Sequence, residues 1–244
     1  MSPVSSLTLS IVMPAYNEEK TVATVVQRVL KEVPCELELI IVNDGSTDRT
    51  GEIVTELASS DPRIRVFHQK NAGKAAALKQ GFEKTRGRIV IVQDADLEYD
   101  PAEIIHVIQP ILDGKADVVY GSRFLVRRAA RVLYFYHYVA NRVITLLSNL
   151  FTNLNMTDVE TGYKAMRGDI VRAMVIKSRG FGIEIEITAK VAKWGAAVYE
   201  VPISYYGRTY EEGKKVGTID GIMALWYILR FNLLWNRDQS FQKL

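Results

Sequence analysis

The sequence predicts an α/β protein with a mostly parallel central sheet flanked by helices. Short apolar segments without polar alternation recur through the first half, and an amphipathic helical pattern follows each of the first four. Polar turn clusters separate these units. Strands covered on both faces read as continuous apolar runs, and parallel pairing needs a crossover connection. Ligands bind such sheets beyond the carboxyl ends of the strands.

The predicted strands and helices alternate as far as Arg123. The first strand covers residues 9–13, and a helix with its valines on one face covers residues 21–31. The cluster Asn43-Asp44-Gly45-Ser46 ends the second strand and supplies a cap for the next helix. The remaining elements of this half are strand 37–42, helix 48–58, strand 64–67, helix 74–84, strand 89–93, helix 102–112 and a strand that begins at 118.

Beyond Arg123 the alternation stops. The pattern then predicts a long helix at 132–151, a loop at 157–162, a helix at 181–194, a strand at 198–203 and a final helix at 219–235. We therefore expect one large domain of residues 1–217. Residues 218–244 are expected to form an amphipathic C-terminal helical extension that could lie at a membrane interface.

The charge balance argues against a nucleic-acid-binding protein. The 244 residues carry 31 Lys and Arg against 28 Asp and Glu, a net charge of +3, which is too small for a protein that wraps a phosphate backbone. The single cysteine, Cys35, excludes an intrachain disulfide and is consistent with a reducing compartment. Residues 1–8 lack a basic start followed by an apolar run, so we expect no cleaved signal and a cytoplasmic location.

Two aromatic-rich helical stretches, 132–151 and 219–235, approach the length that spans a bilayer. Polar residues interrupt both, among them Arg142 in the first and Asp220 and Arg230 in the second, and such residues are costly at the centre of a bilayer. We therefore expect peripheral contact with the membrane surface. The alternative is that these stretches pack on each other or on a second subunit, which would make the protein a homo-oligomer.

Five loops follow the predicted strands and should converge on one site; they are residues 14–18, 43–46, 71–74, 94–100 and 121–124. The strongest signal is an apolar strand that ends in Asp94, Ala95 and Asp96, with Glu98 two positions later. Carboxylates suit Mg²⁺ or Mn²⁺, which favour oxygen ligands and keep bonds to substrate phosphates. The alternative is a solvated acidic turn that caps the next helix.

Two other loops have the composition to contact a nucleotide. Pro14 and Tyr16 could hold a flat base or ribose, while Asp44 could accept hydrogen bonds from a base and Gly45 permits a sharp turn. The plainer interpretations are a helix-entry loop for the first segment and an Asx turn with a helix cap for the second. An Asx turn is compatible with binding.

These three loops together resemble those of family 2 glycosyltransferases of the GT-A fold, in which the first two contact the nucleotide and the Asp-any-Asp loop holds the metal. Later motifs resemble the dolichol-phosphate mannose synthase group within that family. These motifs are Gly121-Ser122-Arg123, Thr157-Asp158, Thr161-Gly162-Tyr163-Lys164 and Glu200-Val201-Pro202-Ile203-Ser204 with Arg208 and Lys214. The resemblance covers nearly the whole chain.

The resemblance implies roles for individual residues. Those implied to contact the nucleotide are Pro14, Tyr16, Glu18 and Asp44, and those implied to contact the metal or diphosphate are Asp94, Asp96 and Glu98, with Ala95 beside them in the substrate site. Some members carry an amide at the position of Glu98. Basic residues matching positions around the phosphates are Arg123, Arg208 and Lys214 and, with different spacing, Arg142 and Arg179. The expected catalytic residues are Asp96, Arg123 and Arg208.

The chemistry of the acceptor decides whether a general base is needed. A phosphate acceptor that meets a diphosphate leaving group creates like-charge repulsion, which arginines offset with paired donors. A phosphate monoester is largely ionised at neutral pH because its second pKa is about 6, whereas a hydroxyl acceptor would need a base. Asp158 and Glu186 are the candidates for such a base. We favour structural roles for both, either as helix caps or paired with Lys164 or Lys190.

The resemblance implies an inverting, metal-dependent transferase. It would move a hexose, mannose or glucose, from GDP or UDP onto a polyprenyl phosphate such as dolichol or undecaprenyl phosphate, at the cytoplasmic face of a membrane. Residues 205–217 combine glycines, aromatic rings and charges. This composition favours a lid that closes over the substrate, and the alternative is an ordinary disordered surface loop. Two alternatives stay open. One is the same donor site with a saccharide or another soluble hydroxyl acceptor, and the other is a nucleotide-sugar-binding module without turnover.

Overall fold

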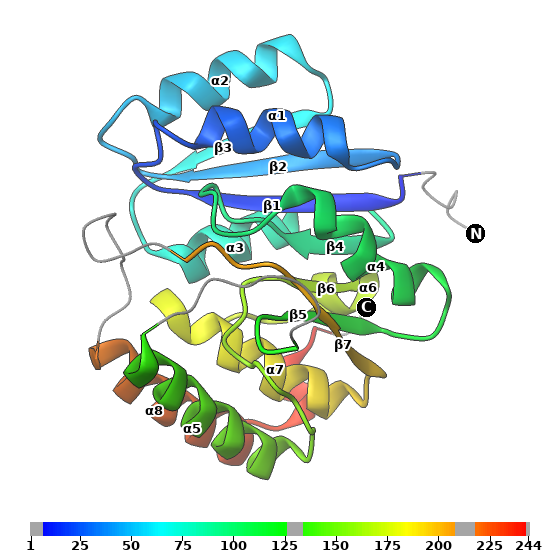
Figure 1. Cartoon of the computed structure of the whole chain (residues 1–244), viewed down its shortest axis with the longest axis vertical. Helices are drawn as coiled ribbons and strands as arrows, with labels where there is room; N and C mark the ends of the chain where they lie inside the picture. The colour runs from blue at the N-terminus through cyan, green and yellow to red at the C-terminus, as the bar shows by residue number, and fades with distance from the viewer. Residues whose placement is uncertain (1–6, 126–133, 208–217, 243–244) are drawn as a thin grey trace.

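A computed structural model describes residues 7–125, 134–207 and 218–242, which are built around a seven-stranded sheet. The strands lie in the order β3-β2-β1-β4-β6-β5-β7 (Figure 1). Their bounds are β1 Leu9–Ala15, β2 Leu37–Asp44, β3 Ile64–Gln69, β4 Ile89–Val92, β5 Val118–Ser122, β6 Lys164–Arg167 and β7 Val198–Pro202.

All strands except β6 point in the same direction, which confirms the prediction of a mostly parallel sheet. β6 runs antiparallel to both of its neighbours, β4 and β5. The sequence analysis placed no strand there because β6 has four residues, of which Lys164 and Arg167 are charged. The fifth strand extends to Ser122, so Gly121 and Ser122 belong to the sheet and not to a loop.

Helices connect the strands, and their positions agree with the sequence pattern to within a few residues. The segments that the described residues form are α1 Val22–Glu32, α2 Thr50–Ser60, α3 Lys74–Glu83, η1 Pro101–Glu103, α4 Ile104–Leu112, α5 Phe135–Thr152, α6 Gly168–Ala173, η2 Gly180–Gly182, α7 Ile183–Trp194, α8 Thr218–Leu233 and α9 Arg237–Ser240. The short helix α6 was not predicted.

The sheet is covered on both faces. Side chains alternate between the faces along a strand, so Ile11 of β1 packs with α1, α2 and α4, whereas Val12 packs with α3, α6 and α7. α3 approaches β1 closely at Gly81, where a Cβ atom would lie 2.3 Å from Val12 Cγ1. A larger residue at Gly81 would displace α3 from the sheet, and the first residue of α3, Lys74, would move with it.

α5 and α8 form a further layer outside α7, side by side at one end of the molecule (Figure 1). Ile144 of α5 and Ile228 and Phe231 of α8 share a buried apolar cluster with Ile185 of α7. After α9 the chain pairs back onto the body through a bridge between Met174 and Phe241. The predicted domain division after residue 217 falls at the edge of residues 208–217, which lie outside the described ranges.

Candidate active site

The five predicted loops converge at the carboxyl ends of the strands. The Asn17 side chain accepts a hydrogen bond from the Thr47 amide at 2.8 Å, and the Glu18 amide donates to the Thr50 hydroxyl at 2.8 Å. The Thr21 hydroxyl donates to the Ala95 carbonyl at 2.9 Å. The loops after β1, β2 and β4 are therefore tied together by direct hydrogen bonds, which confirms the predicted convergence for these three loops.

Asp44 joins the second loop to the third. Its carboxylate is buried and accepts hydrogen bonds from the Gln69 side chain at 2.6 Å, the Ala72 amide at 2.9 Å and the Gly73 amide at 2.8 Å. The Asn43 side chain accepts from the Ser46 amide at 3.2 Å, so this cluster forms a turn as expected. The predicted helix cap from residues 43–46 is wrong, because α2 begins at Thr50 and Asp48 accepts from the Thr50 amide at 2.9 Å. Asp44 thus shapes the loop before Lys74, and its contact with a base stays a prediction.

Lys74 joins the third loop to the fourth. Its ammonium lies 3.0 Å from Asp94 Oδ1, 3.1 Å from Asp94 Oδ2 and 3.2 Å from Glu184 Oε1. Burial lowers the pKa of Lys74, but the charges of Asp94 and Glu184 more than offset that effect and raise it above the ordinary value. Lys74 is therefore a permanent cation between two carboxylates, at the place where the sequence predicts a cationic metal.

The Asp94-Ala95-Asp96 segment directly follows β4, as predicted. Asp96 is buried and its carboxylate accepts from the Glu98 amide at 3.1 Å, whereas the Glu98 carboxylate accepts from the Tyr205 hydroxyl at 2.9 Å. Within residues 7–125, 134–207 and 218–242, no three His, Cys, Asp or Glu side chains lie close enough together to hold a metal. A cage of three carboxylates is therefore not formed by these residues.

Asp94 and Asp96 could nonetheless bind a divalent cation whose remaining ligands come from a diphosphate. Asp94 and Asp96 supply hard oxygen atoms, and such a cation completes its shell with phosphate oxygens and water. Gly162 leaves room beside Asp94, because a Cβ atom there would lie 2.9 Å from Asp94 Oδ2. These observations favour Asp94 and Asp96 as the protein ligands.

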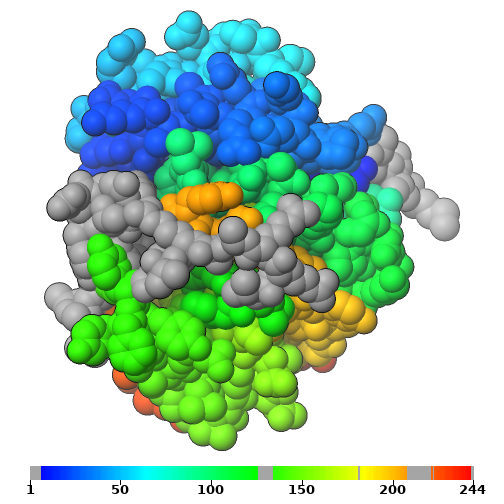
Figure 2. Space-filling model, in the orientation of Figure 1, coloured from blue at the N-terminus to red at the C-terminus, as the bar shows by residue number. Residues whose placement is uncertain are grey.

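Three tyrosine side chains pack together beside the loop that contains Asp94 and Asp96. The rings of Tyr99 and Tyr163 stack with their centroids 4.6 Å apart, and the Tyr205 ring lies 5.3 Å from Tyr99. The Gly162 amide donates to the Tyr99 hydroxyl at 2.9 Å, and burial raises the pKa of Tyr99 to about 12. Figure 2 shows the segment after β7, in orange, lying against the green segment that follows β4. Tyr205 thus brings the segment after β7 to the candidate site.

Arg123 has a partner that the sequence analysis did not assign to it. Its Nε and Nη2 donate to the two oxygens of Asp158, each at 2.7 Å, and its amide donates to the same carboxylate at 3.1 Å. Asp158 therefore has the structural role that we favoured, but its ion-pair partner is Arg123 and not one of the two lysines named as alternatives. Glu200 supports this pair by accepting from the Thr157 amide at 2.9 Å and the Asp158 amide at 3.2 Å.

The second candidate base, Glu186, has a structural role as expected. Its fully buried carboxylate forms an ion pair with Lys190 and accepts from the amides of Lys177 at 2.9 Å and Ser178 at 2.7 Å. The prediction of a Glu186 pair with Lys190 is confirmed. A buried carboxylate with three charged or amide donors is satisfied in the fold.

Of the other predicted basic residues, Arg179 lies near the third loop, Arg142 lies on α5, and two lie outside the described residues. Arg179 is exposed at the start of η2, and the neighbouring Gly180 lies next to Gly73, since a Cβ on Gly73 would be 3.7 Å from the Gly180 nitrogen. Arg142 is exposed on α5. Arg208 and Lys214, which carry the lid prediction, lie within residues 208–217 and thus outside the described part of the chain.

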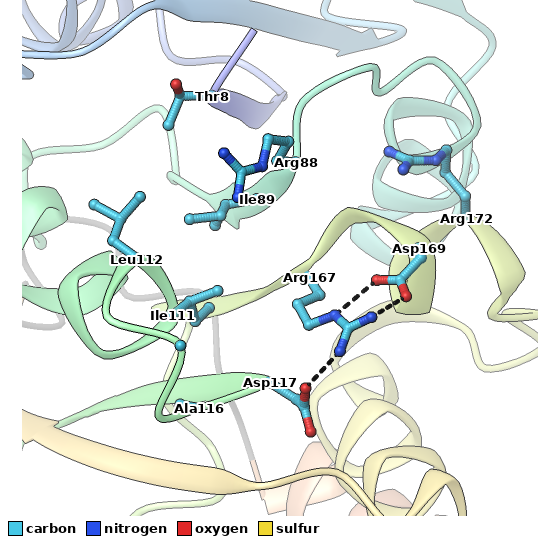
Figure 3. A pocket seen from close by; sticks show the side chains of 11 residues that line it. Thr8, Arg88, Ile89, Ile111, Leu112, Ala116, Asp117, Arg167, Asp169 and Arg172 are labelled. Atoms are coloured by element: carbon cyan, nitrogen blue, oxygen red, sulfur yellow. Dashed lines mark hydrogen bonds and ion pairs between the residues drawn. The ribbon is translucent and has the colours of Figure 1, made fainter. Parts of the chain in front are cut away.

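A hollow of about 430 Å³ lies at the opposite ends of these strands, where β1, β4 and β5 begin (Figure 3). Arg167 crosses it and pairs with Asp117 at 2.9 Å and Asp169 at 2.5 Å. Since ligands of parallel sheets bind at the carboxyl ends of strands, this hollow is not the predicted site.

The sequence analysis missed residues that only the fold brings to the site. Lys74 was included in one of the five loops but received no role, and Tyr99 and Glu184 were not singled out. The signal for Lys74 was its place at the end of a loop that follows a strand. Glu184 gave no such signal, because it lies in the first turn of α7, far from the loops in sequence.

Comparison with known proteins agrees with this geometry. A family model described as "Glycosyl transferase family 2" matches residues 10–174. The chain is 30% identical over 216 residues to polyprenol monophosphomannose synthase of Mycolicibacterium smegmatis, covering 85% of this chain and 81% of that protein. It is 31% identical over 221 residues to undecaprenyl-phosphate mannosyltransferase of Micrococcus luteus, covering 86% and 88%.

The fold is also similar to that of solved structures. Glucosyl-3-phosphoglycerate synthase from Mycobacterium tuberculosis, solved in complex with Mn²⁺, UDP and glucosyl-3-phosphoglycerate, matches with a TM-score of 0.71. The match covers 93% of this chain and 80% of that one, at 22% identity. At this identity the likeness shows the fold alone.

Proposed function

The chain belongs to glycosyl transferase family 2 and has the GT-A fold, and from this premise we propose that it moves a hexose from a nucleotide-sugar onto a polyprenyl phosphate. Both relatives named above act, by their names, on a polyprenol or undecaprenyl phosphate and transfer mannose. Mannose or glucose as the sugar, GDP or UDP as the carrier and the cytoplasmic face of the membrane as the location belong to the proposal.

The choice of acceptor rests on the contacts that the two candidate bases, Asp158 and Glu186, make in the fold. Asp158 holds Arg123, and Glu186 holds Lys190 and two amides, so neither carboxylate is available to take a proton from a hydroxyl. A phosphate acceptor attacks in its ionised form and does not need such a base. The paired carboxylates therefore favour a phosphate over a soluble hydroxyl acceptor.

In the proposed reaction, some residues of the site bind the substrates and others neutralise their charge. Asp94 and Asp96 would hold Mg²⁺ or Mn²⁺, which supplies charge neutralisation for the departing nucleoside diphosphate. Tyr16 is exposed on the first loop, where it can cover a base or ribose. Lys74 keeps its charge beside Asp94 and orients that carboxylate. Inversion at the sugar carbon follows if the acceptor phosphate attacks from the side opposite the diphosphate.

We expect the purified protein to transfer sugar from one member of a panel of nucleotide-sugars, including GDP-mannose and UDP-glucose, to undecaprenyl phosphate. Product would be measured as radiolabelled lipid after solvent extraction, with undecaprenol, which lacks the phosphate, as the matched control acceptor. Transfer to soluble saccharides but not to the lipid phosphate would favour the hydroxyl-acceptor alternative. Binding of a nucleotide-sugar without any transfer would favour the non-catalytic module.

A membrane face would bring the site to its lipid acceptor. α5 and α8 expose large apolar side chains that are each at least half accessible, namely Phe135, Tyr136, Leu146, Leu150, Trp226 and Leu233. Apolar patches of this kind mark interaction surfaces in proteins of this size. A search of the described helices for a membrane-crossing segment finds none. These helices would therefore lie in the headgroup region, with exposed Arg142 and Arg237 attracting anionic lipids.

The double variant Leu146→Glu/Leu150→Glu is expected to weaken binding to anionic liposomes by at least about tenfold, because it places two charges on the apolar face of α5. Liposome flotation at low salt, with acceptor lipid included, measures this. Leu112→Glu, on the exposed end of α4, is the matched control and should bind as the unchanged protein does. If the unchanged protein fails to float, the membrane face is wrong. A dimer that the double variant converts to a monomer would instead indicate a subunit interface.

A further inference from the structure

Two buried carboxylate oxygens, one of them on the Glu184 side chain that pairs with Lys74, have no hydrogen-bond partner among the described residues. Glu184 is 6% exposed, and its Oε1 pairs with Lys74 at 3.2 Å, while its Oε2 is buried without a partner in residues 7–125, 134–207 and 218–242. Glu160 Oε1 is likewise buried without a partner. Leaving a buried acceptor unsatisfied destabilises a protein, and the cost is larger for a charged group. Such groups call for an explanation in terms of a missing donor.

The two carboxylates form one cluster although they come from different elements. Glu160 lies in the loop before β6, and Glu184 lies in the first turn of α7. Burial raises the pKa of Glu160 to about 7, and the charge of Glu184 adds to this effect while Lys164 opposes it. Burial also lowers the pKa of Lys164 to about 8, against the charges of Glu184 and Glu160. The charges therefore lie close enough together to affect one another.

The cluster lies where the transferred sugar of the proposed donor must be. In the proposed function Asp94 belongs to the loop that would bind the diphosphate, and the Lys74 ammonium connects Asp94 to Glu184. The sugar is bonded directly to the diphosphate, so its ring has to lie next to Asp94. Its hydroxyls are hydrogen-bond donors, which is what the unpartnered oxygens lack.

We propose that Glu184 and Glu160 determine sugar specificity by accepting hydrogen bonds from hydroxyl groups of the transferred hexose, with Lys74 holding Glu184 in position. This inference rests on the proposed function and concerns the sugar end of the donor. A site built to accept from a hydroxyl rejects an analogue that lacks it by large factors, because the buried acceptor is then left unpaired. The pocket should therefore discriminate against deoxy sugars.

The first test asks whether each carboxylate contributes to binding of the sugar but not of the nucleotide. Binding of GDP, UDP, GDP-mannose and UDP-glucose would be measured by calorimetry for the unchanged protein, Glu184→Gln and Glu160→Gln, with Glu52→Gln on the surface of α2 as the control. We expect Glu184→Gln to bind the free nucleotide within about twofold of the unchanged protein and the nucleotide-sugar at least about tenfold more weakly. Unchanged nucleotide binding also shows that the variant is folded.

Donors that lack one hydroxyl sharpen the assignment. In the unchanged protein, removal of the hydroxyl that Glu184 binds should lower kcat/KM by at least about tenfold, whereas in Glu184→Gln the same removal should cost less than about twofold. Equal losses with every deoxy donor, or unchanged affinity for the nucleotide-sugar, would overturn the assignment and indicate that buried waters satisfy these oxygens. Unchanged donor affinity in Glu160→Gln with a large loss of kcat would instead make Glu160 a general base. Failure of the unchanged protein to bind any nucleotide-sugar would count against the proposed function itself.

Discussion

Asp96→Asn is expected to lower turnover by at least about a hundredfold with little change in fold. The substitution keeps the size of the side chain and its oxygen, which accepts from the Glu98 amide at 3.1 Å, but it removes the negative charge. Preorganised charge at a developing anion contributes about a hundredfold to a thousandfold to turnover in enzymes. A carboxylate that helps to hold a divalent cation at the leaving diphosphate should therefore be indispensable.

Steady-state rates and thermal unfolding together check this expectation. Asp113→Asn, at the end of α4 and far from the converging loops, is the matched control and should retain its activity. Chelation of divalent cations should reduce the rate of the unchanged protein as the substitution does, and added Mg²⁺ or Mn²⁺ should restore it. Full activity of the folded Asp96→Asn variant in the presence of chelator would refute the metal role of this loop.

Asp158→Ala is expected to destabilise the protein by about 3–5 kcal/mol. The carboxylate is fully buried and receives two side-chain hydrogen bonds and one amide from Arg123. Removal of one partner of a buried ion pair leaves the other charge uncompensated. Urea unfolding would measure the loss, with Asp113→Ala as the control. The double variant Arg123→Met/Asp158→Leu should lose less than the sum of the single changes, since it removes both charges. Additive losses would show that the pair is not coupled.

The same pair predicts a dependence of stability on pH. Burial alone would raise the pKa of Asp158, but the charge and hydrogen bonds of Arg123 lower it below its ordinary value. A carboxylate with a lowered pKa in the folded state stabilises the protein above its unfolded pKa of about 3.9, and that stability is lost as the pH falls through the folded pKa. The unchanged protein should therefore lose stability below about pH 4 more steeply than Asp158→Ala does.

The parallel half of the fold could be predicted from sequence because each strand there is a continuous apolar run with a polar loop after it. The site loops followed from the same rule, which correctly brought the Asn43 turn, Asp94 and Asp96 to one edge. β6 could not be predicted, because a four-residue strand with a charged residue at each end has no apolar run. Such a strand is fixed by the neighbours it pairs with and not by its own composition.

The charge partners were harder to predict than the loops. Arg123 was assigned to phosphates, and Asp158 was expected to cap a helix or pair with a lysine, yet the two pair with each other across 35 positions of sequence. Lys74 and Glu184 are separated still further and meet only because α3 and α7 cover the same face of the sheet. Pairing of this kind depends on the tertiary arrangement, which local patterns do not encode.

The place of β6 in the sheet has a consequence for how the chain is made. During synthesis, β1 to β4 emerge and can pair in order, but β4 is left as an open edge because its other neighbour is β6 and not β5. β5 emerges next and has no partner in the sheet until Lys164–Arg167 emerges and inserts between the two. A nascent chain shorter than about 167 residues therefore exposes the apolar edge of β4, a template for unwanted pairing between chains. The segment that closes this edge carries a charge at each end, which makes it a poor strand alone and keeps it from aggregating before it docks.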